Sequence, residues 1–158
     1  MSVLSSWRET CQKLHEMHLE ARRSWSRGEV EVVGEVDGVK VELRYEGSNR
    51  NCDYRTVLLN GEMFARECEC VPWNLLRDIT VDYTCFVDLP LHKARKLAIE
   101  AGLEVVSHRS AEENHCWVTE EWYPAENGPL RYFIVCRTLD QVVRLWKLWN
   151  AKYKIELN

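Results

Sequence analysis

Residues 29–46 read EVEVVGEVDGVKVELRYE, and this stretch decides the fold. Its Asp37-Gly38 pair is typical of a two-residue type I′ turn, in which both residues adopt positive φ. Apolar side chains alternate with charged ones on both sides of the turn, so the stretch predicts a hairpin with one apolar face. The expected cross-strand pairs are Val36–Val39, Gly34–Val41, Val32–Leu43 and Val30–Tyr45 on the apolar face, and Glu35–Lys40 and Glu31–Arg44 on the charged face.

Further strands are expected on the C-terminal side of this hairpin. Asn60-Gly61 marks a second hairpin, between residues 54–59 and 62–68. Apolar segments bounded by proline, glycine and polar residues predict four more strands. These strands are expected at residues 79–87, 103–108, 115–123 and 130–137.

Three helices are expected from their start signals. A capping box pairs a Ser or Thr hydroxyl with a Glu or Gln three residues later, and both Ser6/Glu9 and Thr138/Gln141 fit this pattern. Pro90 fits the first position of a helix between them. The helices are expected over about residues 6–27, 90–101 and 139–153.

This order of elements predicts an α+β fold: a mainly antiparallel sheet with an N-terminal helix, a middle crossover helix and a C-terminal helix packed on it. No linker rich in Gly, Ser or Pro divides the chain, and no repeat is visible. We therefore expect a single domain over residues 1–158. The alternative is two lobes, 1–71 and 72–158, that meet near Pro72.

The composition indicates an ordinary soluble domain. The chain has 158 residues, 46% of them hydrophobic, and a formal net charge of -4. No window approaches the ~18 apolar residues of a membrane span, and no signal-like N-terminal region is present, so no membrane contact is expected. The seven cysteines lack the spacing of a secreted disulfide scaffold. They are expected to be reduced thiols in a cytoplasmic, reducing compartment.

One pair of cysteines resembles half of a metal site. Cys68 and Cys70 would point to the same side of a strand and could both reach a zinc ion. A structural zinc site needs four ligands, and the chain has no second close pair at the usual spacing. No metal and no other cofactor is therefore expected, with Cys68 and Cys70 as the candidates if a metal is bound.

Three residues are the candidates for catalysis if the protein is an enzyme. Cys116 is a possible nucleophile, but adjacent strand residues point to opposite faces, so His115 is badly placed as its base and His108 would have to serve. His108 also begins a His-x-Ser motif like that of phosphodiesterases with two such motifs, but the chain has one copy. A small hydrolase or phosphodiesterase-type enzyme using His108, His115 or Cys116 is one alternative function.

A nucleic-acid-binding module is the second alternative. Residues 91–153 follow the order α-β-β-β-α and in this order resemble the double-stranded RNA-binding domain. That family grips phosphates with a lysine-rich start to its last helix, where this chain has residues 138–141, TLDQ. The likeness is therefore one of topology only. Basic residues do gather around Arg95 and Lys96, although the net negative charge argues against broad phosphate contact.

Tryptophan content is the main hint toward function. The chain has seven tryptophans, a residue type enriched in the anchors of protein interfaces. Two lie on the expected first helix and two on the expected last helix, and we expect a homodimer that uses one of these helices. Since no catalytic motif stands out, the sequence predicts a non-catalytic protein that acts by protein–protein interaction, such as an inhibitor or a regulatory accessory factor of a larger complex. The expected binding residues are Trp7, Trp25, Trp146, Trp149, Arg95 and Lys96.

Overall fold

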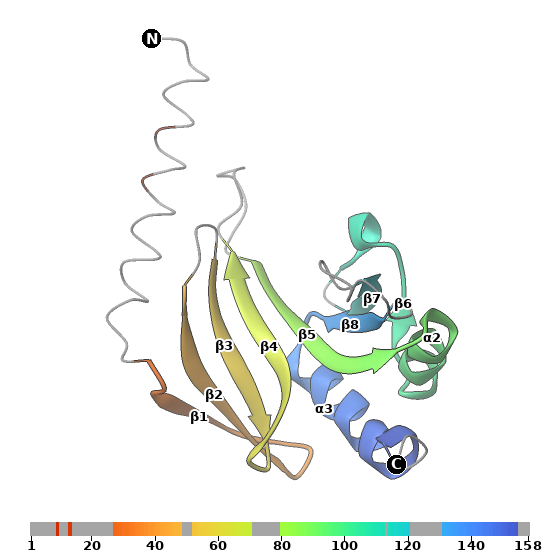
Figure 1. The fold of residues 1–158 in the computed structure, drawn as a ribbon, viewed down its shortest axis with the longest axis horizontal. Helices are drawn as coiled ribbons and strands as arrows, with labels where there is room; N and C mark the ends of the chain where they lie inside the picture. Colours follow the sequence, from red (N-terminus) through yellow and green to blue (C-terminus); the bar gives the residue numbers. More distant parts are fainter. Residues whose placement is uncertain are drawn as a thin grey trace.

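The computed structural model describes residues 9, 13, 27–48, 52–70, 80–112, 114–120 and 131–154. Its strands form one sheet in the order β1-β2-β3-β4-β5-β8-β7-β6 (Figure 1). Neighbouring strands are antiparallel except for β6 and β7, which are parallel, so the sheet is mixed. The strands are β1 (Val30–Val36), β2 (Val39–Ser48), β3 (Cys52–Leu59), β4 (Glu62–Cys70), β5 (Thr80–Leu89), β6 (Glu104–Val105), β7 (His115–Glu120) and β8 (Tyr132–Cys136).

The turns of both predicted hairpins are confirmed. Asp37 and Gly38 have φ values of 50° and 78°, and Asn60 and Gly61 have φ values of 49° and 82°. These positive pairs are what type I′ turns require. The register next to the first turn is also the expected one, because Gly34 lies opposite Val41 and the two pairs nearer the turn are aligned as predicted.

A β-bulge between Val32 and Gly34 overturns the rest of the predicted register of the first hairpin. Because side chains alternate along a strand, the one-residue shift turns Glu31 to the face that was expected to be apolar. There its carboxylate accepts a hydrogen bond of 2.8 Å from Nη1 of Arg55 on β3. Val32 is left 61% exposed. The expected pairs that do not form are Val32–Leu43, Val30–Tyr45 and Glu31–Arg44.

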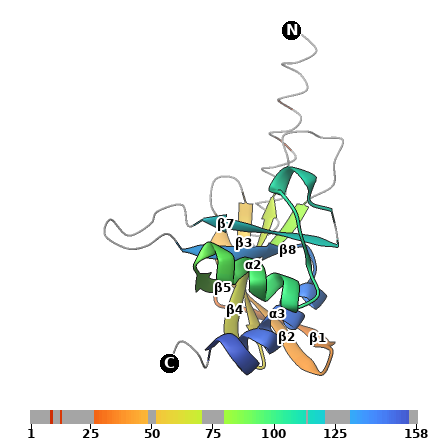
Figure 2. The same cartoon turned by 90° about the vertical axis from the view of Figure 1, so that its right-hand side faces the viewer.

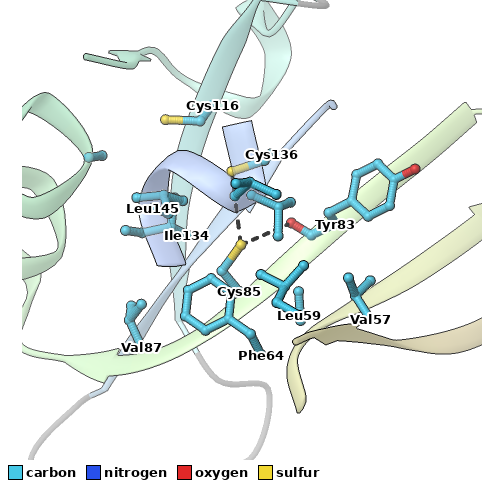
Figure 3. Packing of buried hydrophobic residues seen from close by; sticks show 14 of the residues in the cluster. Val57, Leu59, Phe64, Tyr83, Cys85, Val87, Cys116, Ile134, Cys136 and Leu145 are labelled. Atoms are coloured by element: carbon cyan, nitrogen blue, oxygen red, sulfur yellow. Dashed lines mark hydrogen bonds between the residues drawn. The ribbon is translucent and has the colours of Figure 1, made fainter. Parts of the chain in front are cut away.

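Two α-helices pack on one face of the sheet. α2 (Leu91–Glu100) begins one residue later than predicted, because Pro90 is its N-cap. α3 (Leu139–Leu148) begins with the predicted capping box of Thr138 and Gln141. A π-helical turn, η2 (Trp149–Tyr153), continues α3. The apolar side chains of both helices join alternate side chains of the strands in one core, part of which Figure 3 shows.

The predicted fold class is wrong. The parallel pair of β6 and β7 makes the sheet mixed, and the helices described are two, α2 and α3, both in the C-terminal half. α2 is not a middle helix that joins neighbouring strands, because β8 and β7 lie between β5 and β6 in the sheet. α3 also reaches the first hairpin, where Nζ of Lys147 donates to the carboxylate of Asp37 at 2.8 Å. The N-terminal helix expected over residues 6–27 lies almost entirely outside the described residues.

β8, β7 and β6 extend the sheet beyond β5, and α2 packs over this part of the sheet. Figure 2 shows α2 crossing in front of the strands, with β7 beside it. A short 3₁₀ turn, η1 (His108–Ser110), stands where the predicted strand over residues 103–108 should end, because β6 stops at Val105. Over the ranges that the structure describes, no helix is both long and apolar enough to cross a lipid bilayer.

Candidate functional site

A groove lies between α2, the segment that follows β6, and β7. Its volume is about 560 Å³. Helix α2 contributes Arg95 and Ile99, η1 contributes His108, and β7 contributes Trp117 and Val118. Ile99 is 64% exposed, so it adds apolar surface to the rim of this groove. The groove therefore combines exposed apolar surface with cationic and aromatic groups, and we call it the α2–β7 groove.

Trp117 is the aromatic part of the α2–β7 groove. Its neighbour Cys116 faces the core, so Trp117 faces the opposite side of the sheet. The ring of His108 lies against the indole, with ring centroids 4.8 Å apart and ring planes 31° apart. The guanidinium carbon of Arg137 lies 5.2 Å from the indole centroid. Between these neighbours Trp117 is only 7% exposed, so it forms a fixed wall of the groove.

Arg137 holds this wall in place. Its Nη1 donates to Oδ1 of Asp82 on β5 at 2.9 Å, and its Nη2 donates to the carbonyl of Ala111 at 3.2 Å. Burial raises the pKa of the Asp82 carboxyl, and the positive charges of Arg137 and His108 oppose that shift. One arginine therefore connects β5, the indole on β7 and the loop after η1.

The three candidate catalytic residues are not arranged as a nucleophile with its base. Cys116 is fully buried, and burial raises the pKa of its thiol to about 12, so the thiol stays protonated at neutral pH. Nδ1 of His115 accepts a bond of 3.1 Å from the backbone N–H of Glu112, and its Nε2 lies 3.5 Å from the carboxylate of Glu104. His108 contacts Trp117, on the side of the sheet opposite to Cys116.

The candidate metal pair lies on β4. Cys68 is half-buried, and the side chain of Cys70 is outside the described part of the chain. Within that described part, no three His, Cys, Asp or Glu side chains come close enough together to hold a metal ion. The donors described here do not form the ligand set of a structural zinc site.

The six expected binding residues do not form one surface among the described residues. Arg95 and Lys96 are exposed on α2, where Arg95 lines the α2–β7 groove and Lys96 lies 3.8 Å from the carboxylate of Glu100. Trp146 and Trp149 are half-buried and pack against the core. The two remaining residues, Trp7 and Trp25, lie outside the described residues.

Sequence reasoning missed three residues of this site. Ile99 carried a signal, since it is a large apolar residue outside the apolar stripe of the helix over residues 90–101. Trp117 carried a weaker one, because its place next to Cys116 on a strand puts it on the face away from the core. No sequence signal pointed to Arg137, because its contacts with Asp82 and Trp117 depend on which strands are neighbours in the sheet.

No family model, no curated protein and no solved structure matches this chain.

Proposed function

We propose that this protein is a non-catalytic binding protein that acts by contact with another protein, as a small inhibitor or regulatory accessory factor of a larger complex would. The α2–β7 groove is the surface proposed for that contact. The single observation that carries the proposal is the 64% exposure of Ile99 at the rim of a groove with a fixed aromatic wall.

The chemistry of the α2–β7 groove suits a protein partner. Arginine and large apolar side chains are frequent in protein interfaces, and the groove presents Arg95 and Ile99 in front of the buried indole of Trp117. Trp117 is already held by His108 and Arg137, so little conformational entropy would be lost there on binding. A preorganised wall beside an exposed aliphatic side chain favours binding over turnover.

The test is recovery of a partner by immobilised wild-type protein and by two matched variants. Ile99→Glu places a charge in the groove, and Met63→Glu places the same charge at another exposed apolar side chain, on β4 and outside the groove. Quantitative mass spectrometry of proteins retained from the native host compares the three baits. A partner retained by wild type and by Met63→Glu, but reduced at least about tenfold by Ile99→Glu, supports the proposal.

The opposite pattern would contradict it. If every protein retained by wild type is retained equally by Ile99→Glu, the groove is not the contact surface. Turnover of phosphodiester or acyl substrates that disappears in His108→Ala would overturn the non-catalytic part of the proposal. Ile99 and Met63 are both exposed, so neither Ile99→Glu nor Met63→Glu is expected to unfold the protein and obscure the comparison.

Nucleic-acid binding is the second candidate, favoured by one observation. His92, Lys93, Arg95 and Lys96 are all exposed on α2. If they contact phosphates, affinity for a duplex should fall steeply with salt, because each phosphate contact releases counterions. A salt-independent affinity, or none, would remove this candidate.

For localisation, we propose a reducing, cytoplasmic compartment. Cys85, Cys116 and Cys136 are buried free thiols, and the sulfurs of Cys85 and Cys136 lie 4.0 Å apart (Figure 3). Thiols this close stay reduced where the cellular redox buffer is reducing. Thiol counting on protein denatured directly from the host should find these three unpaired, and a disulfide among them would contradict the proposal.

A further inference from the structure

Part of the β7 edge beside the α2–β7 groove has no paired strand among the described residues. β6 pairs with β7 only at its start, where Glu104 lies opposite His115 and Val105 opposite Cys116. The backbone N–H of Val106 then donates to the carbonyl of Cys116 at 2.9 Å, and the chain leaves the sheet through η1. Among the described strands, the next residues of β7 have a neighbour on the β8 side only.

The direction of the backbone groups on this edge follows from the alternation of an antiparallel ladder. The carbonyl of Cys116 points away from β8, toward β6, as its bond with Val106 shows. Two residues further along, the N–H and carbonyl of Val118 must point the same way. Val118 also lines the α2–β7 groove, so this donor and acceptor face the groove. An open edge of this kind is what an added strand pairs with.

The spacing of side chains on α2 matches the spacing of a strand. Arg95 and Ile99 are one helical turn apart, four residues or about 6 Å along the axis. Alternate residues of a strand are about 6.6 to 6.8 Å apart and point to the same face. Two alternate side chains of a strand added to β7 could therefore lie beside Arg95 and Ile99 together. The side chain between them would face Trp117 and Thr119.

We propose that the α2–β7 groove takes an extended segment of a protein partner, which pairs with β7 as an added strand where β6 stops. The segment has an acidic and an aliphatic side chain two residues apart, the acid beside Arg95 and the aliphatic group beside Ile99. This inference rests on the proposed function and adds its mode of recognition. Charge selects the acidic side chain, because the exposed face of α2 that borders the groove also carries His92 and Lys96.

The first experiment selects a displayed library of random heptapeptides on the immobilised wild-type protein. The expected peptides have Asp or Glu two positions from Leu, Ile or Val, and they displace the partner recovered by the wild-type protein. Selection on Arg95→Glu should replace the acidic residue by Lys or Arg. Lys93→Glu is the matched control, since it makes the same charge change on α2 outside the groove lining and should leave the preference unchanged.

The second experiment tests strand pairing with the best synthetic peptide of that selection. Bound peptide should slow the hydrogen exchange of the Val118 amide, and N-methylation of one pairing peptide residue should weaken binding at least about tenfold. Both readouts report backbone pairing, which a side-chain-only contact would not produce.

Each part of the inference has results that would overturn it. Peptides without the acidic–aliphatic spacing, no enriched peptides, or a charge preference unchanged by Arg95→Glu would remove the proposed recognition. Binding that tolerates every N-methyl group and leaves the Val118 amide unprotected would remove strand addition. The proposed function stands after any of these results if Ile99→Glu protein still fails to retain the partner and Met63→Glu protein still retains it. Light scattering of the peptide-free protein identifies the remaining case: self-association lost in Arg95→Glu would make the occupant a second copy and contradict the proposal.

Discussion

Cys116 shows how its position on a strand decides the chemistry of a single side chain. Its thiol faces the core beside Cys136, and burial raises its pKa from the ordinary 9.0 to about 12 (Figure 3). Between these two pH values the folded protein holds a proton that the unfolded chain has released. The free energy of unfolding should therefore fall as pH rises through this window.

This prediction is checked by thermal unfolding at a series of pH values from 8 to 11. Wild type should lose stability progressively above the ordinary thiol pKa. Cys116→Ala should lose less over the same range, although its stability at pH 8 is lower because the exchange leaves a cavity. Parallel curves for the two proteins would mean that the thiol of Cys116 ionises as easily in the folded state as in the unfolded one.

Arg137 makes contacts that a lysine cannot reproduce. Its planar guanidinium bonds Asp82 and Ala111 at once while it lies against Trp117. Arg137→Lys should therefore destabilise the protein by about 1 to 2 kcal/mol in urea denaturation. The matched control is Arg131→Lys, in a looser pair with Asp88 at 3.8 Å, where the change should stay below about 0.5 kcal/mol. If Arg137→Lys and Arg131→Lys lowered the free energy of unfolding equally, the guanidinium geometry of Arg137 would not contribute to stability.

At the level of elements, the turn of the first hairpin requires positive φ at both of its residues, Asp37 and Gly38. Gly38 has a φ of 78°, and a Cβ built on it would meet no atom within 4 Å. Gly38→Val should destabilise the protein by at least about 1 kcal/mol, because a β-branched residue resists positive φ. Gly38→Asn should cost less, since Asn adopts this conformation more readily. An unchanged urea midpoint for Gly38→Val would contradict the type I′ turn.

Local signals predicted the two hairpin turns and the N-cap of α3, whereas long-range contacts decided the register of β1 and the order of the strands. The capping box of Thr138 and Gln141 was readable because both of its partners lie within one helical turn. The bulge in β1 could not be predicted from the hairpin sequence. The register shift brings Glu31 against Arg55, which belongs to another strand, β3. The candidate site was predictable to the same extent. The sequence predicted Arg95 as a basic residue on a helix face, but its position beside β7 depends on the order of the strands.

At the scale of the whole molecule, the order of strands could not be deduced from the sequence. The segment after β5 predicted strands and helices in nearly the right places, yet β6 pairs in parallel with β7 at the edge instead of joining β5. Strand order follows from which apolar faces α2 and α3 cover together, and that is a property of the assembled core. The open edge of β7, and with it the proposed binding mode, exists only because β6 is so short.

The opposite edge of the sheet bears on self-association. The large apolar side chains that the described residues leave exposed include Val30, Val32 and Val33, all on the edge strand β1, with exposures of 44%, 61% and 45%. An apolar edge strand is a site where a second copy pairs, and two identical edges satisfy a two-fold axis. The tryptophans of the last helix are poorer candidates, because Trp146 and Trp149 pack against the core of their own chain.

We therefore expect a homodimer joined through β1, with twice the 18.7 kDa mass of the chain in light scattering at micromolar concentration. Val32→Lys should return the mass to that of one chain without unfolding, because a lysine at an exposed edge opposes pairing. Met63→Lys, at an equally exposed apolar position on β4, should leave the dimer intact. Trp149→Glu should lower the unfolding midpoint instead, because its ring packs against the core. A single-chain mass for wild type would rule out the dimer, and a dimer lost in Trp149→Glu but kept in Val32→Lys would move the interface to the last helix.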